Sequence, residues 1–595
     1  MTMTKHNHIN YLITEHIDIW SSVIKRKSSA GRGSSKKIEL YGIKKLRELI
    51  LELAVRGKLV PQDPNDEPAS VLLERIAQEK AQLVKEGKIK KPKKLPDITE
   101  DEKPFELPDG WEWSRLSDLA QIGPRNTDVD DDVTVSFVPM PLILTSYKGS
   151  HGSEIRKWKD IKKGYTHFID GDIALAKITP CFENSKAAIF TDLENGIGAG
   201  TTELHVARPL PNTLDPLFIL LYLKAPMFLK VGESKMTGSA GQKRVPSDFF
   251  ANNPLPFAPI EEQHRIVTKV DELMVLCDEL EAQTESSLDA HQTLVTVLLD
   301  TLVNSQNAEE LAENWTRISG HFDTLFTTEQ SIDQLKQTIL QLAVMGRLVE
   351  QNPNDEPASV LLERIAAEKA DLIKQGKIKK QKPLPLISED EKSFELPERW
   401  RVSSVDSCFY VSGGIQKTPK RAPVSNHYPY LAVANVQRGN IDINDLKRFE
   451  VTGEELDQYR LESFDLLVVE GNGSENEIGR CAIWKGEIEN CLHQNHLIKC
   501  RPAIHKLSDW VLMVLNSPLG ISEMKRLAVT SSGLYNLSVG KVRTILLPIP
   551  PLEEQHRIVA KVDELMAICD QLKVSLSEEQ TTQLNLADAL VEQAL

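Results

Sequence analysis

Two segments of the chain carry the same stripe of apolar residues. In the first, apolar residues fall at Ile266, Val270, Leu273, Cys277 and Leu280, in steps of three and four. This spacing places them on one face of a helix. The second segment repeats the stripe 292 positions later. Leucines continue the first stripe as far as position 302, so it predicts one helix of about 40 residues, about 60 Å long.

The rest of the helical framework is repeated as well. Residues 64–77 recur letter for letter 289 positions later, and the segment Glu-Glu-Gln-His-Arg-Ile-Val at 261–267 recurs 292 positions later. Between the paired blocks lie two inserts, 114–250 and 402–542, whose sequences show no evident match. The chain is therefore a repeated frame that holds two different inserts, which indicates a protein that recognises two different things.

Each repeated block also contains a shorter helix followed by a basic tract. We expect the helix of the first copy to begin near Asp66, to have Pro68 in its first turn, and to end near Gly87. Lys-Pro tracts follow at 88–96 and 377–385. Such a tract is either a solvated, extended linker or a phosphate contact, and the sequence leaves both interpretations open.

Both inserts have the pattern of mixed α and β globules. Short apolar or alternating runs bounded by Gly, Pro and Asn predict strands. They lie at 133–139, 172–178, 187–190 and 204–207 in the first insert and at 430–434, 465–469, 481–484 and 497–500 in the second. A helix is expected at 215–229 and at 508–527. The two globules thus share an order of elements while differing in their surface residues.

Charge is distributed unevenly along the chain. The net charge of −15 argues against a nucleic-acid partner, because phosphate binding relies on Lys and Arg. Residues 114–250, however, hold 16 basic and 16 acidic side chains, whereas residues 261–333 hold 3 basic and 16 acidic ones. The acidic helical segment suits a solvated face or a basic protein partner. If DNA is bound, the inserts must bind it through local patches.

The seven cysteines and the absence of a long apolar run indicate the cellular compartment. No run of 18 apolar residues occurs, and no CxxC pair is present. These features predict a soluble protein of the cytoplasm with reduced thiols, no membrane contact, and no zinc or disulfide framework. Cys277 and Cys569 lie at matching positions of the apolar stripe, so we expect them in the core.

Catalytic and metal-binding motifs are weak. There is no GxxxxGK[ST] loop and no Asn/Asp-Pro-Pro-Tyr segment. Asp172 with Glu183 could imitate a nuclease carboxylate pair, although an Asp at a strand start is typical of a turn. His264 follows Glu261 by three residues, as His556 follows Glu553. A helical metal pair would have this spacing, but the third ligand is missing, which favours capping or subunit contact.

The order of variable globule, repeated helical block, variable globule and repeated helical block resembles the specificity subunit of type I restriction-modification enzymes. The Glu-Glu-Gln-His-Arg-Ile-Val segments at 261–267 and 553–559 carry this resemblance. The near-identical repeats and the segment ending at Tyr41 suggest the type IB subclass. The resemblance implies an α+β fold, in which two mixed α/β target-recognition globules are separated by long antiparallel repeated helices with a pseudo-twofold internal repeat.

The resemblance also implies function and partners. Each globule would read half of a bipartite double-stranded DNA site, and the helices would fix an unread spacer and dock two copies of a methyltransferase subunit, which restriction subunits join. S-adenosylmethionine, ATP and Mg would then be used on other subunits, and this chain would bind no cofactor and no metal and would have no catalytic residues. The family's terminal repeat is split between the two chain ends, so both ends together would mimic the central block.

The expected domains follow from the repeat boundaries. They are an N-terminal helical segment and flexible basic linker (1–37), a proximal repeated helical block (38–113), target-recognition domain 1 (114–250), a central repeated helical region (251–400), target-recognition domain 2 (401–545) and a distal repeated helix (546–595).

Base recognition needs donors and acceptors on loops at groove depth. The candidates in the first insert are Lys177, Thr179, Lys186, Thr201, Thr202, Gln242, Lys243 and Arg244. In the second they are Gln416, Lys417, Arg421, Asn472, Ser474, Arg480, Gln494, Asn495, Tyr535 and Asn536. The candidate subunit contacts are Glu261, His264, Arg265, Glu553, His556 and Arg557.

Two other functions compete with DNA specificity. One is a single-chain restriction or methylation enzyme with its own catalytic centre, which the missing cofactor motifs disfavour. The other is a purely structural helical scaffold, which would show no preference among DNA sites. For any single candidate residue, an ordinary polar loop position is as good an interpretation as base contact.

Overall fold

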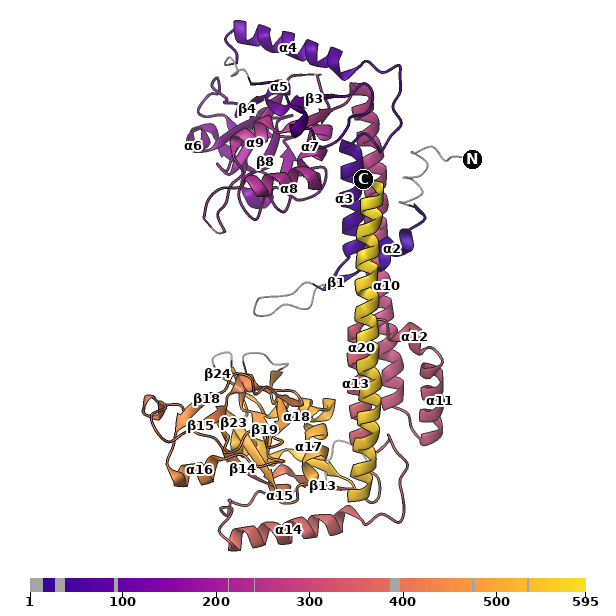
Figure 1. Cartoon of the computed structure of the whole chain (residues 1–595), viewed down its shortest axis with the longest axis vertical. Coiled ribbons are helices and arrows are strands. Elements are labelled where there is room, and N and C mark those ends of the chain that lie inside the picture. The colour runs from indigo at the N-terminus through magenta and orange to yellow at the C-terminus, as the bar shows by residue number, and fades with distance from the viewer. Residues whose placement is uncertain are drawn as a thin grey trace. The chain divides into compact units, whose positions relative to one another are not determined.

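The computed structural model describes residues 14–26, 38–89, 95–211, 213–239, 241–385, 396–472, 477–531 and 534–595. Their contacts divide the chain into two compact units (Figure 1). Among described residues, unit 1 comprises 14–26, 38–287 and 579–595, and unit 2 comprises 288–578. Helices α10 (Ile260–Val303) and α20 (Leu552–Ala594) each contribute residues to both units. In the described part of the chain, no helix combines the length and apolarity needed to cross a bilayer.

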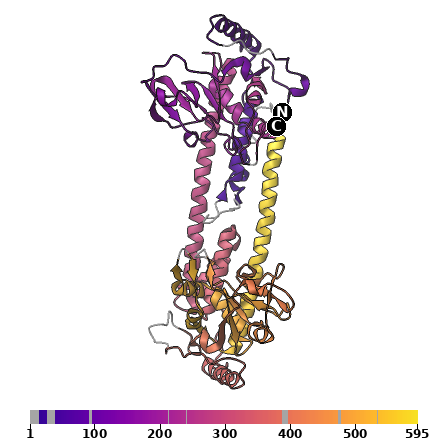
Figure 2. The same cartoon turned by 90° about the vertical axis from the view of Figure 1, so that its left-hand side faces the viewer.

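The helical part of unit 1 consists of α2 (Ile17–Ser22), α3 (Tyr41–Val55), the start of α10 and the end of α20. A short pair, β1 (Lys25–Arg26) and β2 (Ile38–Glu39), precedes α3. The apolar stripe of α10 is buried at Ile266, Val270, Leu273 and Cys277 and half-buried at Leu280, and Cys277 is 1% exposed. Arg47 on α3 pairs with Asp278 on α10 at 2.6 Å, and α3 lies beside α10 in both Figure 1 and Figure 2. The Tyr41 hydroxyl donates to Asp588 on α20 at 3.0 Å.

The globule of unit 1 is built on two four-stranded sheets, ordered β6-β5-β10-β7 and β4-β11-β8-β9. Their strands are β4 (Ala120–Ile122), β5 (Thr134–Val138), β6 (Glu154–Lys157), β7 (Thr166–Ile169), β8 (Ile173–Ala176), β9 (Ala187–Ile189), β10 (Ile197–Gly200) and β11 (Leu204–Pro209). A separate pair, β3 (Glu112–Arg115) and β12 (Pro254–Phe257), joins the globule's two chain ends. The helices are α5 (Leu116–Leu119), α6 (Trp158–Ile161), α7 (Pro216–Lys224), α8 (Pro226–Lys235) and α9 (Ser247–Asn252). Phe168 stacks on Phe190 in the core at 3.6 Å between ring centroids.

The helical part of unit 2 consists of α11 (Ala308–Ser319), α12 (Phe322–Leu325), α13 (Glu329–Val344), the end of α10 and the start of α20. One core includes Leu299 of α10, Leu335 of α13 and Ile558 of α20. Cys569 is 1% exposed in this core, which confirms its predicted burial.

The globule of unit 2 contains sheets ordered β14-β23-β19-β21, β18-β15-β22 and β20-β25-β24, with the pairs β13-β26 and β16-β17. The strands are β13 (Arg401–Ser404), β14 (Phe409–Gly413), β15 (His427–Leu431), β16 (Val436–Gln437), β17 (Asn440–Ile441), β18 (Lys447–Glu450), β19 (Leu466–Val469), β20 (Gly471–Asn472), β21 (Cys481–Ile483), β22 (Leu492–His493), β23 (Leu497–Pro502), β24 (Val529–Ser531), β25 (Leu534–Asn536) and β26 (Leu546–Ile549). The helices are α15 (Val405–Cys408), α16 (Gly453–Tyr459), α17 (Leu507–Asn516), α18 (Pro518–Leu527) and α19 (Val539–Thr544). Strands lie at seven of the eight predicted positions, and at the eighth, 430–434, β15 covers only the first two residues before a 3₁₀ helix at Val433–Asn435.

Matching hydrogen bonds hold both frames together. The indole N–H of Trp111 donates to Glu262 at 2.9 Å in unit 1, and that of Trp400 donates to Glu554 at 3.0 Å in unit 2. Burial raises the pKa of Glu262 and of Glu554. The two repeated blocks therefore share side-chain contacts as well as amino-acid sequence.

The helix ends also match between the units. Lys58 donates to the carbonyl of Leu595 at the end of α20, and Arg347 donates to the carbonyl of Val303 at the end of α10 at 2.8 Å. These partners lie 289 and 292 positions apart in sequence, the offsets of the two repeated blocks. The end of α20 thus takes in unit 1 the place that the end of α10 takes in unit 2.

Helix boundaries differ from the prediction in two ways. The repeated short helices, α4 (Ala69–Lys85) and α14 (Ala358–Lys374), begin after the prolines, which are their N-caps. Asp66 lies before α4 and pairs instead with Arg265 of α10 at 2.5 Å. The long helix expected in each globule is broken into two, α7 and α8 at Pro226 and α17 and α18 at Pro518, because proline lacks the N–H that continues a helix.

The two Lys-Pro tracts differ in what can be described. Residues 90–94 of the first tract lie outside the described residues, as does most of the expected N-terminal segment 1–37. In the second tract the Gln381 amide donates to the carbonyl of Val411 at 2.7 Å, and Arg543 donates to the carbonyl of Lys382 at 2.6 Å. This part of the second tract is therefore bound to its globule.

Candidate nucleic-acid interface

Most candidates of the first insert meet where three segments join. The segments are 177–179 after β8, 201–203 before β11, and 237–245 after α8, of which residue 240 lies outside the described part. We call this arrangement the first junction. The Lys177 N–H donates to the carbonyl of Glu203 at 2.9 Å, and the Thr179 N–H donates to that of Lys243 at 3.0 Å. Arg244 bridges both Ile178 and Thr237. Seven of the eight predicted residues of this insert belong to these segments.

The second globule contains the same junction. Gly471 and Val529 both pair with Asn536, as Ile178 and Thr237 pair with Arg244. The Glu470 N–H donates to the carbonyl of His496 at 2.9 Å, and the Leu537 N–H donates to that of Glu470 at 2.7 Å. We call the segments 470–472, 494–496 and 529–537 the second junction, of which residues 532 and 533 lie outside the described part.

The two junctions match residue for residue, at offsets of 292 or 293, but present different side chains. Lys177 matches Glu470, Thr179 matches Asn472, Thr201 matches Gln494, Thr202 matches Asn495, Glu203 matches His496, Lys243 matches Tyr535 and Arg244 matches Asn536. One backbone arrangement therefore carries two unrelated sets of donors and acceptors.

Electrostatics separate the junctions. Arg244 in the first junction forms a two-pronged ion pair with Glu203, at 2.9 Å and 2.8 Å, and this pair lowers the pKa of the Glu203 carboxyl. Lys177 and Lys243 add two cations there. At the matching positions, the second junction has Glu470 beside His496, with 3.3 Å between Oε2 and Nδ1. The first junction is thus the more positive of the two.

Three other candidates have structural partners. Lys186 donates to the carbonyl of Met140 at 3.0 Å. Arg421 pairs with Glu455 at 2.7 Å, and this contact with a backbone hydrogen bond lowers the pKa of Glu455 to about 2. Arg480, whose side chain is 13% exposed, contacts Gln437 at 3.0 Å and Glu477 at 3.4 Å.

Of the remaining candidates of the second insert, two lie beside the second junction and two have side chains that are not described. Gln416 and Lys417 are exposed directly after Ile415, whose carbonyl accepts the Asn495 N–H at 2.9 Å. They therefore lie next to the second junction. Ser474 falls outside the described residues, and the side chain of Asn472 is likewise not described.

A buried ion pair in each globule was missed at the sequence level. Asp172 is 1% exposed and accepts the Arg208 guanidinium at 2.9 Å. Asp465, also 1% exposed, accepts that of Arg501 at 2.7 Å. An Asp at a strand start with an Arg-Pro step 36 residues later, present in both inserts, was the available signal. Because Arg208 occupies the Asp172 carboxylate, the nuclease-like interpretation of Asp172 has no support.

Buried lysines also escaped the sequence prediction. Lys224 donates to the carbonyl of Ser185 at 2.7 Å, and Ser185 lies a few residues after the 177–179 segment of the first junction. Burial lowers the pKa of Lys224 to about 7. Lys499 donates to the carbonyls of Gln458 and Arg460, and burial lowers its pKa to about 8. Neither lysine is available to a phosphate in this conformation.

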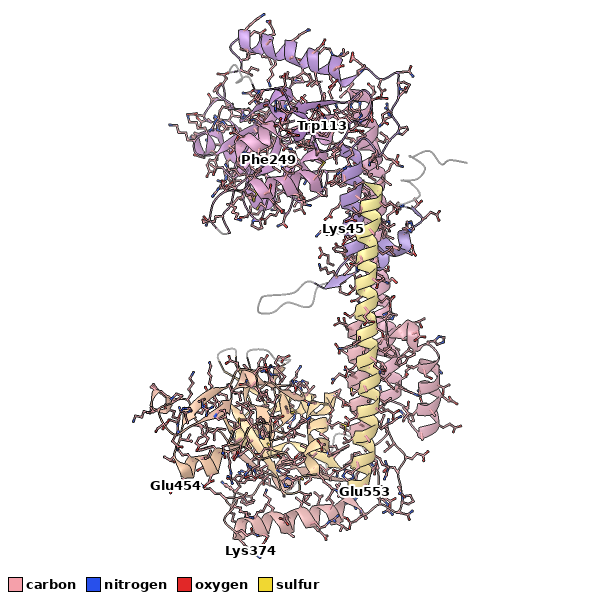
Figure 3. The ribbon with its side chains drawn as sticks, in the orientation of Figure 1. Lys45, Trp113, Phe249, Lys374, Glu454 and Glu553 are labelled. Atoms are coloured by element: carbon pink, nitrogen blue, oxygen red, sulfur yellow. The ribbon has the colours of Figure 1, made fainter. Side chains whose placement is uncertain are left out.

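The candidate subunit contacts lie at the starts of α10 and α20. Glu261 and Glu553 are exposed, each near the histidine three residues later, at 3.9 Å and 3.7 Å, and Figure 3 marks Glu553. Arg265 and Arg557 instead bind Asp66 and Asp355 within their own units. No cluster of three or more potential metal ligands occurs among the described residues.

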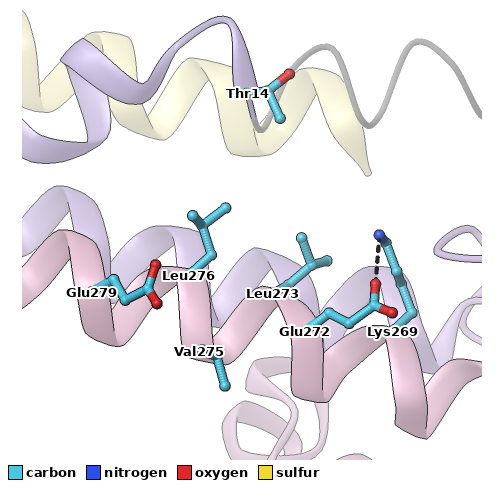
Figure 4. Close-up of a pocket in the computed structure, with 7 residues that line it drawn as sticks. All are labelled: Thr14, Lys269, Glu272, Leu273, Val275, Leu276 and Glu279. Atoms are coloured by element: carbon cyan, nitrogen blue, oxygen red, sulfur yellow. Dashed lines mark hydrogen bonds and ion pairs between the residues drawn. The ribbon is translucent and has the colours of Figure 1, made fainter.

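A groove lies on α10 in unit 1, directly after the candidate subunit contacts at the start of this helix. It is lined by Lys269, Glu272, Leu273, Val275, Leu276 and Glu279, with Thr14 opposite (Figure 4). Its leucine and valine side chains are framed by charged ones.

Comparison with known proteins decides the family. A model of the type I restriction modification DNA specificity domain matches residues 108–290 and again 397–579. The chain belongs to the type I restriction-modification specificity subunits. The EcoAI specificity subunit of Escherichia coli is 54% identical over 99% of this chain and 100% of its own length. The EcoEI specificity subunit of the same species is 53% identical, with the same coverage.

Solved structures of this family are more distant. The HsdS subunit from Thermoanaerobacter tengcongensis is 18% identical and covers 83% of this chain and 98% of its own, with a TM-score of 0.40. The two matches of the family model each contain one junction and the start of one long helix, so the specificity subunit is a tandem repeat of the same domain.

Proposed function

We propose that this specificity subunit reads a bipartite DNA site, with one half-site for each globule. The observation that carries the proposal is the pair of junctions, which share their backbone hydrogen bonds and differ in their side chains. A shared backbone arrangement fixes how a loop meets the groove, and the side chains on it select the bases. Two unlike sets then select two unlike half-sites.

The acidic net charge of the chain fits this division of labour. Lys177, Lys243 and Arg244 concentrate positive charge at the first junction, whereas 16 acidic side chains lie in residues 261–333. A polyanion is attracted to the former and repelled by the latter. DNA therefore binds the globules, and the long helices serve as spacers that fix the distance between the half-sites.

We infer that the long helices dock the methyltransferase partner in two copies. Leu276 and Leu586 are 37% and 44% exposed in unit 1, and their repeat equivalents Ile568 and Leu294 are 42% and 50% exposed in unit 2. Single exposed leucines are common, but exposure of the same apolar positions in both repeats supports two equivalent docking faces. Methyl transfer and cleavage then take place on the partner subunits, and this chain has no catalytic centre.

Sequencing of modified bases tests the proposed specificity. The chain is co-expressed with its methyltransferase partner in cells that lack other DNA methylation. We expect modified adenines in one motif with two defined halves and an undefined spacer of constant length. A chain expressed alone that methylates DNA would support the single-chain enzyme instead, and modification without a motif would support a scaffold.

Native mass spectrometry tests the docking faces. Leu276→Asp and Ile568→Asp are each expected to reduce the complex from two methyltransferase copies to one, and the double variant to none. Val574→Asp is the matched control, because Val574 is 59% exposed on α20 and its repeat equivalent is Ala282. Two bound copies in the double variant would contradict the assignment of this face.

A further inference from the structure

The turn at Gln494 and Asn495 in the second junction has a fixed backbone. The Gln494 N–H donates to the carbonyl of Leu431 at 3.0 Å, and the Asn495 N–H donates to that of Ile415 at 2.9 Å. Gly414 lies against the turn so closely that a Cβ there would come within 2.4 Å of the carbonyl oxygens of His493 and Gln494. The turn is therefore held between two neighbouring segments.

In the described part of the chain, no hydrogen bond engages the side-chain amides of this turn. Both residues are half-buried, and within the described residues the fold's hydrogen bonds engage their backbone N–H groups rather than their side-chain amides. An amide on a rigid backbone keeps one donor and one acceptor side by side. Such a group is prepared for a partner that offers the complementary pair.

The surrounding charge indicates which partner. Glu470 lies in the same junction and its side chain is 29% exposed, so a phosphate at this turn would meet a carboxylate. A base edge carries no net charge and is not repelled. Among base edges, the N6 and N7 atoms of adenine in the major groove offer the donor and acceptor that an Asn or Gln amide binds with two hydrogen bonds.

The first junction has no such group at the matching positions. Thr201 and Thr202 occupy them, and the Thr201 hydroxyl accepts the N–H of Glu203 at 3.2 Å. A hydroxyl cannot form the paired contact of an amide. The first junction instead exposes Lys243, whose ammonium group offers donors and no acceptor.

We infer that Gln494 and Asn495 are specificity-determining residues that read an adenine in the half-site bound by unit 2. This inference rests on the proposed function and deepens it, because it assigns a base to a named turn. The half-site of unit 2 is the one that stays unchanged when residues 114–250 are exchanged for those of a relative.

The experiment places the first junction's residues in the second. The double variant Gln494→Thr, Asn495→Thr is co-expressed with the methyltransferase partner, and modified adenines are mapped against the wild type. We expect one A·T position in the unit 2 half-site to lose its preference by about 5-fold to 150-fold, the value of one paired base contact, while the other half-site is unchanged. Asn444→Ala, an exposed amide outside the junction whose partner is Asp442, is expected to leave the motif intact.

A single isosteric variant guards against misfolding of the double one. Gln494→Glu keeps the size of the side chain and replaces the donor by an acceptor, so we expect the preferred base to change from adenine to cytosine, whose N4 group donates. Relaxation at a G·C position or in the other half-site, or an unchanged motif in both variants, would overturn the inference. A wild-type complex without any bipartite motif would instead refute the proposed function.

Discussion

Replacing Asp172 by Asn tests the buried ion pair in the first globule. The Asp172 carboxylate is 1% exposed and accepts two Arg208 N–H groups at 2.9 Å. Removing one partner of a buried pair costs about 3–5 kcal/mol. The Arg208 side chain is 23% exposed and keeps its hydrogen bond to Asn126 at 3.0 Å. We therefore expect Asp172→Asn to lower the free energy of unfolding by the smaller value of this range, about 3 kcal/mol.

The equivalent variant in the second globule provides an internal comparison. Arg501 contacts Glu462 at 2.9 Å in addition to Asp465, so its guanidinium keeps a carboxylate after Asp465→Asn. We therefore expect a smaller cost, about 1–2 kcal/mol. The exposed control Asp132→Asn loses only surface pairs with Lys157 and Lys159 and is expected to cost less than about 0.5 kcal/mol.

Hydrogen exchange followed by mass spectrometry measures both costs in the full chain. Peptides that cover β8 and β11 report the opening of the first globule, and peptides that cover β19 and β23 report that of the second. The free energy of opening should fall by more in Asp172→Asn than in Asp465→Asn. Equal losses, or a loss in the Asp132→Asn control as large as either, would refute the reasoning from the ion-pair geometry.

Three further predictions concern backbone strain, pH and salt. Gly57 has φ +63°, and a Cβ there would lie 2.5 Å from Pro108. The control Gly87→Ala has a similar φ of +74°, but no atom lies within 4 Å of its Cβ. Gly57→Ala should therefore destabilise unit 1 by about 1–3 kcal/mol more than Gly87→Ala does, and hydrogen exchange measures the difference. Burial lowers the pKa of Lys224 from 10.5 to about 7, and the unfolded chain therefore binds more protons between these values. Stability of unit 1 should rise over this pH range by at most about 1.4 kcal/mol per pH unit, and denaturation of Lys224→Met should show less of this rise. The double variant Lys177→Ala, Lys243→Ala should reduce the slope of log affinity against log salt by about 2 in DNA-binding titrations, whereas an unchanged slope would place neither lysine at a phosphate.

The long helices were predictable because their signal is local. Ile266 and its neighbours recur at helical spacing, and the burial of Cys277 followed from that spacing alone. Proline positions were harder to interpret, since the apolar pattern continues across Pro226 and Pro518 although the helix does not. Local periodicity thus fixed the type of element better than its ends.

The junctions could be predicted as loops but not as one arrangement. Lys177, Glu203 and Arg244 are far apart in sequence, and their meeting depends on strand pairing that leaves no periodic signal. The match to Glu470, His496 and Asn536 is equally hidden, because these three positions share no letter, although the loops have glycines at the matching positions 241 and 533. Arg421 and Arg480 show the opposite problem, since a sequence does not tell a cation that binds an internal carboxylate from one that faces a ligand.

Exchange of residues 114–250 for the corresponding segment of the E. coli EcoAI specificity subunit tests the central claim most directly. The exchanged chain is co-expressed with its methyltransferase partner, and the modified adenines are mapped. The account predicts that one half of the recognised motif changes while the other half and the spacer length remain. A change in both halves, or in neither, would contradict it.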